Sequence, residues 1–259
     1  MMQNIPVVIL CGGMGTRLRE ETEYKPKPMV EIGGKPILWH IMKIYAHYGF
    51  NEFILCLGYK GNIIKEYFFN YDMMCNDCTV QLGKESRIAF QNNHPEQNFK
   101  VTLVDTGLHT MTGGRIKRIQ SYINTDTFMA TYGDGLADIN IDELVKFHHS
   151  HDKIATLTAT RPPSRFGILD MSENGKVNRF REKVVTEWIN GGFFVFDRAV
   201  FDHLSQDCIL EQSPMEKMAE DGQLMAYQHD GFWIGMDTYR EYEMLNQMWD
   251  EGKSPWKIW

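Results

Sequence analysis

The hydrophobic residues in the first half of the chain gather in short runs, separated by segments of helical period. The runs are rich in Val, Ile, Leu and Phe, which is typical of strands buried on both faces of a parallel sheet. Between them, residues 37–45 and 63–71 carry apolar positions at helical spacing. Strands are predicted at residues 5–10, 53–57, 101–105 and 127–132. This alternation of strands and helices predicts an α/β fold with a mostly parallel central sheet.

The pattern changes to shorter alternating segments after residue 166. Residues 168–171 and 176–180 flank a Glu-Asn-Gly-Lys turn and predict a β-hairpin. The aromatic run at 188–196 predicts a core strand, and helices are predicted at about 198–204, at about 214–221 and from about residue 238. Tyr239, Tyr242, Leu245 and Trp249 have helical spacing on the last of these, and we interpret them as core residues. The second half therefore adds a smaller β-rich part.

One stretch fits neither pattern. Residues 72–98 are polar and show no sustained period, so we interpret them as an insertion, of a kind that often serves subunit contacts or covers a substrate. The sequence shows no internal repeat and no Pro/Ser-rich linker. A single domain over residues 1–259 is therefore predicted.

A glycine-rich turn follows the first predicted strand, in the sequence Leu-Cys-Gly-Gly-Met-Gly-Thr-Arg-Leu at residues 10–18. Clustered glycines allow a close backbone approach, and successive N–H groups in such a turn form a trap for anions. Arg17 and Lys27 add positive charge beside it. The turn matches neither the dinucleotide fingerprint, because Leu18 stands where a small residue is needed, nor the P-loop pattern. We therefore expect it to bind a polyphosphate.

Two further places predict ligand contacts. The loop at residues 106–114 is dense in Thr and Gly and precedes Arg115, so it resembles a second cradle. Asp134 lies between two glycines at the end of a predicted strand, where open α/β sheets place their ligands. Polyphosphates bind Mg²⁺, which is usually held by one or two carboxylates. Asp134 is thus the first candidate metal ligand, with Asp237 as the second.

The composition limits the classes of partner that the protein is expected to bind. The formal net charge of −7 argues against nucleic-acid binding, which general electrostatic attraction would drive. No apolar run approaches the roughly 20 residues that a membrane helix needs, and the N-terminus shows no secretory signal, so we expect no membrane contact and a cytoplasmic location. Five scattered cysteines are typical of reduced thiols.

These motifs carry a resemblance. The glycine turn with Lys27 resembles the signature of the sugar-1-phosphate nucleotidylyltransferases. The lysine loop Lys25-Pro-Lys-Pro-Met-Val-Glu-Ile-Gly-Gly-Lys-Pro-Ile-Leu-Trp-His40 and the tail Pro255-Trp-Lys-Ile-Trp259 are similar to the cytidylyl branch of that family. Thr-Tyr-Gly-Asp-Gly at 131–135 and Asn-Gly-Gly-Phe-Phe at 190–194 extend the similarity nearly end to end.

The resemblance implies a Rossmann-like domain in which the nucleotide loop follows the first strand. It divides the chain into a nucleotide-binding half over about residues 1–135 and a β-rich, sugar-phosphate-binding half over about 136–259. It also implies that CTP and α-D-glucose 1-phosphate react to CDP-glucose and pyrophosphate with the help of Mg²⁺. UTP or dTTP in place of CTP, another hexose 1-phosphate, or a non-catalytic regulatory subunit are the alternatives.

Residue roles follow from the same resemblance. Arg17 neutralises the departing pyrophosphate, and Lys27, which fits the family's spacing better than Lys25, bridges the two reacting phosphates. Lys183 is implied to contact the sugar phosphate, although Val184–Glu187 depart from the proline and glycine-rich connection that commonly follows this lysine. Asp134 and Asp237 correspond to the Mg²⁺ ligands. The implied nucleotide contacts are Leu10, Cys11, Gly12, Gly13, Gly15, Thr16, Thr110, Arg115 and Gly133, and the implied sugar contacts are Glu182, Asn190 and Gly191.

Subunit organisation is the remaining expectation. Aromatic residues in the insertion at 72–98 and in the C-terminal tail are expected to be exposed, which predicts a homo-oligomer.

Overall fold

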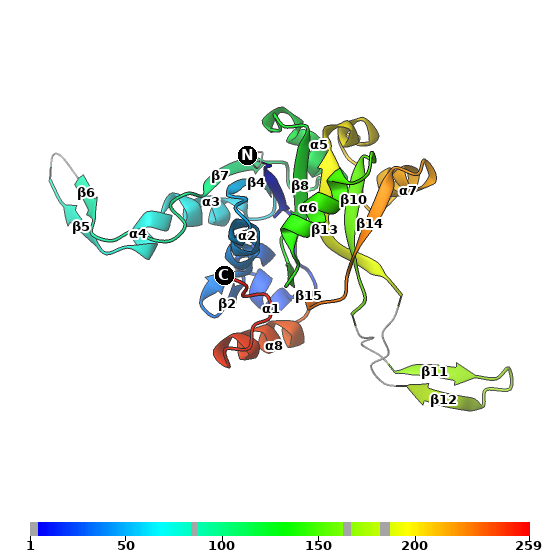
Figure 1. Cartoon of the computed structure of the whole chain (residues 1–259). Helices are drawn as coiled ribbons and strands as arrows, with labels where there is room; N and C mark the ends of the chain where they lie inside the picture. The colour runs from blue at the N-terminus through cyan, green and yellow to red at the C-terminus, as the bar shows by residue number, and fades with distance from the viewer. Residues whose placement is uncertain (1–4, 84–86, 163–166, 182–186) are drawn as a thin grey trace.

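A seven-stranded sheet forms the centre of the molecule (Figure 1). The computed structural model describes residues 5–83, 87–162, 167–181 and 187–259. In sheet order the strands are β14 (Leu224–His229), β10 (Ala155–Thr160), β13 (Ile189–Asp197), β8 (Thr127–Tyr132), β1 (Val7–Leu10), β4 (Glu52–Leu57) and β7 (Lys100–Asp105). The strands predicted in the first half are confirmed, as is the α/β class.

Most neighbouring strands run parallel, and one strand accounts for the exceptions. β1 pairs in parallel with both β4 and β8, β7 continues this direction, and β10 pairs in parallel with β14. β13 lies antiparallel between β8 and β10. The mostly parallel sheet is therefore confirmed, and β13 joins the strands from the two halves of the chain into one sheet.

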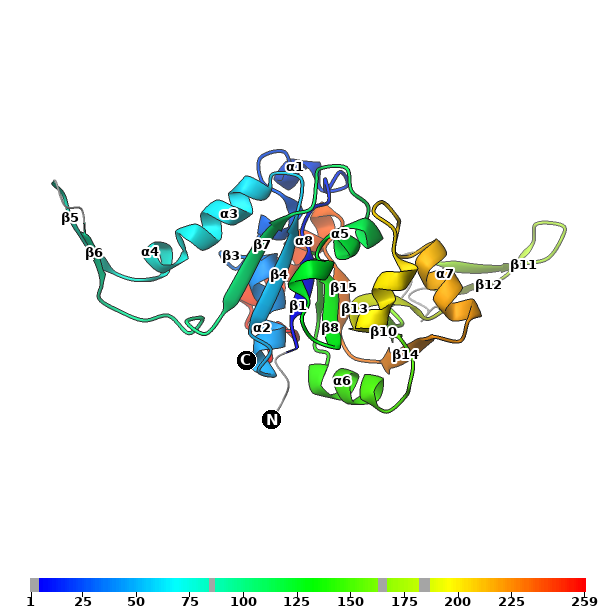
Figure 2. The ribbon, with the colours of Figure 1, turned by 90° about the horizontal axis from the view of Figure 1, so that it is seen from above.

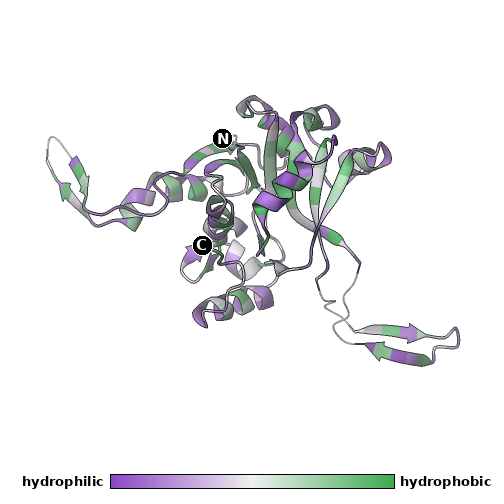
Figure 3. Cartoon of the chain, viewed as in Figure 1, coloured by the Kyte–Doolittle hydropathy of each residue, from purple (hydrophilic) through white to green (hydrophobic). Residues whose placement is uncertain are grey.

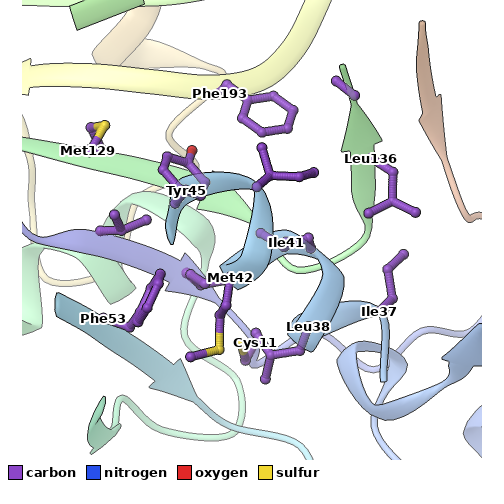
Figure 4. Close-up of a cluster of buried hydrophobic side chains, with 14 of the residues drawn as sticks. Cys11, Ile37, Leu38, Ile41, Met42, Tyr45, Phe53, Met129, Leu136 and Phe193 are labelled. Carbon is purple, nitrogen blue, oxygen red and sulfur yellow. The ribbon is translucent and has the colours of Figure 1, made fainter. Parts of the chain in front are cut away.

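Helices cover both faces of the sheet, because successive side chains of its strands point to opposite sides. In β1, Val7 and Ile9 face one buried cluster, and Val8 and Leu10 face the other. Figure 4 shows Tyr45 beside Phe193 in the first cluster; their rings stack at 6.0 Å. The first face is covered by α2 (Ile37–His47), α6 (Ile141–His149) and α8 (Tyr239–Asp250), and the second by α5 (Thr112–Arg118), the 3₁₀ helix η3 (Arg198–His203) and α7 (Ser213–Glu220).

The helix predicted at about 198–204 is confirmed and is of the 3₁₀ type. One expectation about the last helix needed correction. In the stripe on α8, Leu245 is fully buried, but Tyr239 has an exposed fraction of 44% and is not a core residue. Tyr239 occupies the first turn of α8, where the helix begins beyond the edge of the core. None of the helices in the described ranges has the length and apolarity to span a bilayer.

Two hairpins extend from opposite sides of the body (Figures 1 and 2). One pairs β5 (Cys78–Gln81) with β6 (Arg87–Phe90) and follows α3 (Gly61–Phe69) and α4 (Tyr71–Cys75). It lies within residues 72–98, where the sequence predicted no regular element. The other pairs β11 (Ile168–Met171) with β12 (Val177–Arg181), as predicted.

Two short ladders and three short helices complete the described structure. A small ladder of β2 (Glu31–Ile32) with β3 (Lys35–Pro36) precedes α2, and β9 (Gly135–Ala137) pairs with β15 (Trp233–Gly235). The remaining short helices are α1 (Arg19–Thr22), η1 (Lys27–Met29) and η2 (Gln120–Tyr122).

The C-terminal tail packs into the core, contrary to expectation. Trp256 is fully buried, and its indole Nε1 donates a hydrogen bond of 3.3 Å to Nδ1 of His40 on α2. The opposite ring nitrogen of His40 lies 2.9 Å from the carbonyl oxygen of Ile32. Burial of its ring lowers the pKa of His40 to about 4, so it packs as a neutral group. The tail therefore fastens the lysine loop to the core, and its tryptophans are no evidence for subunit contacts.

Candidate active site

A cavity of about 590 Å³ opens at the carboxyl ends of β1 and β8, and residues from both halves of the chain line it. This is where open α/β sheets bind their ligands, and the volume suits a small molecule. The structure brings most of the predicted site residues together here: Leu10, Gly12, Gly13, Gly15, Arg17, Lys27, Thr110, Arg115, Gly133, Asp134, Asn190, Gly191 and Asp237.

Two predicted residues do not line the cavity, and two more fall outside the described residues. Cys11 is buried, and its backbone N–H donates to the carbonyl oxygen of Cys56 at 3.0 Å. Thr16 is exposed and does not line the cavity. Glu182 and Lys183 lie outside the described residues. The roles assigned to all the site residues, including those that line the cavity, remain predictions.

Arg115 holds two loops that line the cavity together. Its side chain is buried, and its guanidinium donates hydrogen bonds to the carbonyl oxygens of Gly12, Leu57 and Gly107 at 2.9 to 3.0 Å. A further bond reaches Oγ1 of Thr106 at 2.8 Å. The arginine thus fixes the glycine turn against the loop at 106–114, because one guanidinium donates to backbone carbonyl oxygens of both, Gly12 and Gly107. It lines the cavity, while its donors are directed largely at the protein itself.

The glycine turn is closed by a second set of contacts. Gly15 has φ of +64°, a conformation that side-chain-bearing residues rarely adopt. A Cβ there would lie 2.8 Å from a side-chain carbon of Thr22, whose hydroxyl donates to the Gly15 carbonyl at 2.9 Å. The turn therefore needs glycine at this position for both backbone and packing reasons.

The charged centre of the cavity joins Lys27 with the two predicted metal ligands. Lys27 Nζ lies 2.5 Å from Oδ2 of Asp134 and 2.8 Å from Oδ1 of Asp237. Burial disfavours the charged ammonium, but the two carboxylates outweigh it and raise the pKa of Lys27. Arg17 reaches Oδ2 of Asp237 at 3.3 Å from an exposed position. Lys25 lies apart from this group and pairs with Glu21 and Glu31 at 3.7 Å.

Local structure explains how both aspartates reach this point. Asp134 lies two residues after the end of β8, while Asp237 precedes Thr238, the N-cap of α8. Glu241 accepts the backbone N–H of Asp237 at 2.7 Å and that of Thr238 at 2.8 Å, which forms a capping box. The backbone of Asp237 is thus fixed by a helix start that the sequence signature Thr-x-x-Glu indicates.

The pair of carboxylates fits a divalent cation. Both oxygens lie within 2.8 Å of the same lysine nitrogen, and both side chains keep about a third of their surface exposed. Mg²⁺ prefers carboxylate oxygens together with phosphate and water oxygens, so two aspartates beside a phosphate cradle suffice. In the described part of the chain, no group of three or more His, Cys, Asp or Glu side chains is placed to hold a metal ion.

Sequence analysis missed a hydrogen-bonded network that joins Tyr132 and Asn190, which line the cavity, to Glu211, which does not. Tyr132 donates to Oε1 of Glu211, and Asn190 Nδ2 donates to the Tyr132 oxygen at 3.2 Å. Burial, reinforced by the Glu211 carboxylate, raises the pKa of Tyr132. Trp233 Nε1 donates to the carbonyl oxygen of Gly191 at 2.6 Å. Glu211 carries no local sequence signal, because its partner Tyr132 is 79 residues away along the chain.

The chain is similar to known proteins over most of its length. Residues 6–238 match the model of the family described as nucleotidyl transferase. The chain is 52% identical to glucose-1-phosphate cytidylyltransferase of Salmonella typhi, over 97% of this chain and 98% of that protein. It is 47% identical to the probable glucose-1-phosphate cytidylyltransferase of Bacillus subtilis (strain 168), over 97% and 99%.

Solved structures show the same fold. The crystal structure of HddC from Yersinia pseudotuberculosis is similar with a TM-score of 0.68 at 25% identity, covering 95% of this chain and 99% of that one. A putative glucose-1-phosphate thymidylyltransferase from Bacillus anthracis gives a TM-score of 0.69 at 15% identity, covering 94% of each chain. The family model matches residues 6–238, and a relative is 52% identical over 97% of this chain. The chain therefore belongs to the nucleotidyl transferase family.

Proposed function

We propose that the protein transfers a cytidylyl group from CTP to α-D-glucose 1-phosphate and releases pyrophosphate, giving CDP-glucose. The relatives with 52% and 47% identity carry this activity in their names. The observation that supports it most directly is the cluster of Lys27, Asp134 and Asp237 in the cavity. Lys27 and Asp134 come from the first half of the chain and Asp237 from the second. Displacement at phosphorus needs positioning and charge neutralisation, and this cluster offers both.

The nucleotide side has the groups to hold a triphosphate. Gly12, Gly13 and Gly15 line the cavity, so that backbone atoms approach the nucleotide without side chains in between. Arg17, exposed at the mouth, neutralises the charge on the departing pyrophosphate. Lys27 contacts the α-phosphate and the oxygen of glucose 1-phosphate that attacks it. Thr110 and Arg115 complete the nucleotide contacts from the second loop.

Asp134 and Asp237 would hold Mg²⁺, which when bound supplies charge neutralisation for the triphosphate. Their oxygens share the ammonium of Lys27, and this pairing with a cation supports the assignment. On the sugar side, Asn190 and Gly191 line the cavity, and we assign the sugar hydroxyls to them. Glu182 and Lys183 are assigned to the sugar phosphate on the sequence resemblance alone.

We propose the division of labour expected from the sequence, with a nucleotide-binding half over about residues 1–135 and a sugar-phosphate-binding half over about 136–259. The cavity lies between them and is lined by residues from both.

We further propose a homo-oligomer that uses the insertion at 72–98. Figure 3 shows hydrophobic positions on its projecting hairpin, where Val80, Leu82 and Ile88 are exposed. Sedimentation velocity tests this, and a monomer at micromolar concentration would contradict it.

The activity itself is tested by pyrophosphate release with glucose 1-phosphate and CTP, UTP, dTTP, ATP or GTP, each with and without Mg²⁺. We expect strong release with CTP, abolished by EDTA. Release with UTP or dTTP alone would move the protein to a neighbouring branch of the same chemistry. No release with any nucleotide or hexose 1-phosphate would favour a non-catalytic, nucleotide-binding regulatory subunit.

A further inference from the structure

Tyr132 and Glu211 lie behind Asn190, on the wall of the cavity that we assign to the sugar. Glu211 fixes which group donates and which accepts in each hydrogen bond of this network. Its carboxylate accepts from Tyr132 at Oε1 and from the hydroxyl of Thr112 at Oε2, 2.7 Å away. A carboxylate accepts hydrogen bonds and donates none, so the Tyr132 hydroxyl must donate toward it. The phenol oxygen is then left as an acceptor on the side of Asn190.

The direction passes on to Asn190. Its Nδ2 donates to the Tyr132 oxygen at 3.2 Å, while its Oδ1 accepts the backbone N–H of Gly192 at 2.9 Å. Both ends therefore demand the same orientation of the amide, since a flipped side chain would place its NH₂ against the N–H of Gly192. One hydrogen of Nδ2 remains for the cavity that Asn190 lines. A substrate group at this point must accept a hydrogen bond.

We propose that Glu211 is a positioning residue for sugar recognition, which orients Asn190 through Tyr132 so that its amide presents a donor to a hydroxyl oxygen of the sugar. Glu211 does not itself line the cavity. This inference rests on the proposed function, because it assigns a sugar phosphate to that wall.

The same residue ties the wall to the nucleotide side. Thr112 lies at the start of α5, two residues after Thr110, and its Oγ1 also accepts the backbone N–H of Leu210 at 2.9 Å. The segment that carries Glu211 thus packs against the loop at 106–114. In Glu211→Gln, the amide oxygen still accepts from Thr112, whereas the amide nitrogen turns toward Tyr132. The Tyr132 hydroxyl then loses its acceptor at residue 211, and its hydrogen is free to turn toward Nδ2 of Asn190. The Asn190 amide is then held at one end only, by the N–H of Gly192.

The test compares Glu211→Gln with Glu220→Gln, an exposed glutamate at the end of the neighbouring α7. Steady-state kinetics with CTP are measured for glucose 1-phosphate and galactose 1-phosphate. We expect Glu211→Gln to raise the KM for glucose 1-phosphate about ten-fold and to leave the KM for CTP nearly unchanged. The ratio of kcat/KM for glucose 1-phosphate to that for galactose 1-phosphate should fall. Glu220→Gln should behave as wild type. Tyr132→Phe, which removes only the hydroxyl, should reproduce the higher sugar KM.

A double-mutant cycle separates positioning from a general structural role. If Glu211 acts through Asn190, Glu211→Gln adds little to the effect of Asn190→Ala. An unchanged sugar KM in Glu211→Gln, additive effects in the cycle, or equal rises of both KM values with a lowered melting temperature would each overturn the proposal. Wild-type protein that does not turn over CTP and glucose 1-phosphate contradicts instead the proposed function, and it is assayed first for this reason.

Discussion

The two walls of the cavity hold their side chains by different means. On the wall that we assign to the nucleotide, full charges meet at short range, with Lys27 between Asp134 and Asp237. On the wall that we assign to the sugar, Tyr132 and Asn190 are held by a series of directed hydrogen bonds that ends on the carboxylate of Glu211. Charge suits a triphosphate, whose recognition is largely electrostatic, and direction suits a sugar, whose epimers differ only in where a hydroxyl points.

The largest expected effect lies on the charged wall, in Asp134→Asn. The substitution keeps the shape of the side chain but removes one of two negative charges available to a divalent cation. We expect turnover to fall on the order of 10² to 10³-fold, with the Mg²⁺ concentration for half-maximal rate increased. Initial rates over a Mg²⁺ series measure both. A folded variant, judged by circular dichroism, with near-wild-type turnover would refute the metal assignment.

Lys27→Ala comes next, with Lys25→Ala as its matched control in the same loop. Lys27 contacts both aspartates of the cavity, whereas Lys25 pairs with Glu21 and Glu31 away from it. Loss of Lys27 should lower kcat about 100-fold, while loss of Lys25 should change it less than about two-fold. The two variants are compared by pyrophosphate release at saturating substrates. Similar losses in both would show that the contact with the aspartates is not what matters.

These two predictions concern residues that sequence could find, and the contrast with the sugar wall explains why. The glycine turn, Lys27 and Asp134 each follow a recognisable strand or lie in a short motif, so local pattern and topology place them at one edge of the sheet. The first-half strands and β13 were predicted for the same reason, since a buried strand leaves an unbroken apolar run.

Glu211 and the tail show what the sequence could not reveal. Glu211 acquires its role from Tyr132 and Thr112, about 80 and 100 positions earlier, and only the fold brings them together. The expectation that the tail tryptophans are exposed was wrong because Trp256 finds a polar partner in His40, 216 residues away, for its indole N–H. The hairpin of β5 and β6 was missed because its strands are exposed on both faces and show no buried period.

The smallest effect we predict is on the sugar wall, in Gly192→Ala, with Gly222→Ala as its matched control. Both glycines have positive φ, +79° and +63°, so both substitutions strain the backbone by about 1 kcal/mol. Only at Gly192 would the new Cβ lie 2.4 Å from the ring of Tyr132; at Gly222 it meets open space. We therefore expect a small loss of melting temperature from strain in Gly222→Ala and a larger one in Gly192→Ala, where the contact with the Tyr132 ring adds to the strain. The KM for glucose 1-phosphate should rise roughly ten-fold in Gly192→Ala alone, because the displaced ring carries the hydroxyl that orients Asn190. Thermal unfolding and steady-state kinetics of the pair separate the two terms. An equal sugar KM in both variants would mean that the position of Tyr132 is not critical, and the contrast between a charged wall and a directed wall would then lose its basis.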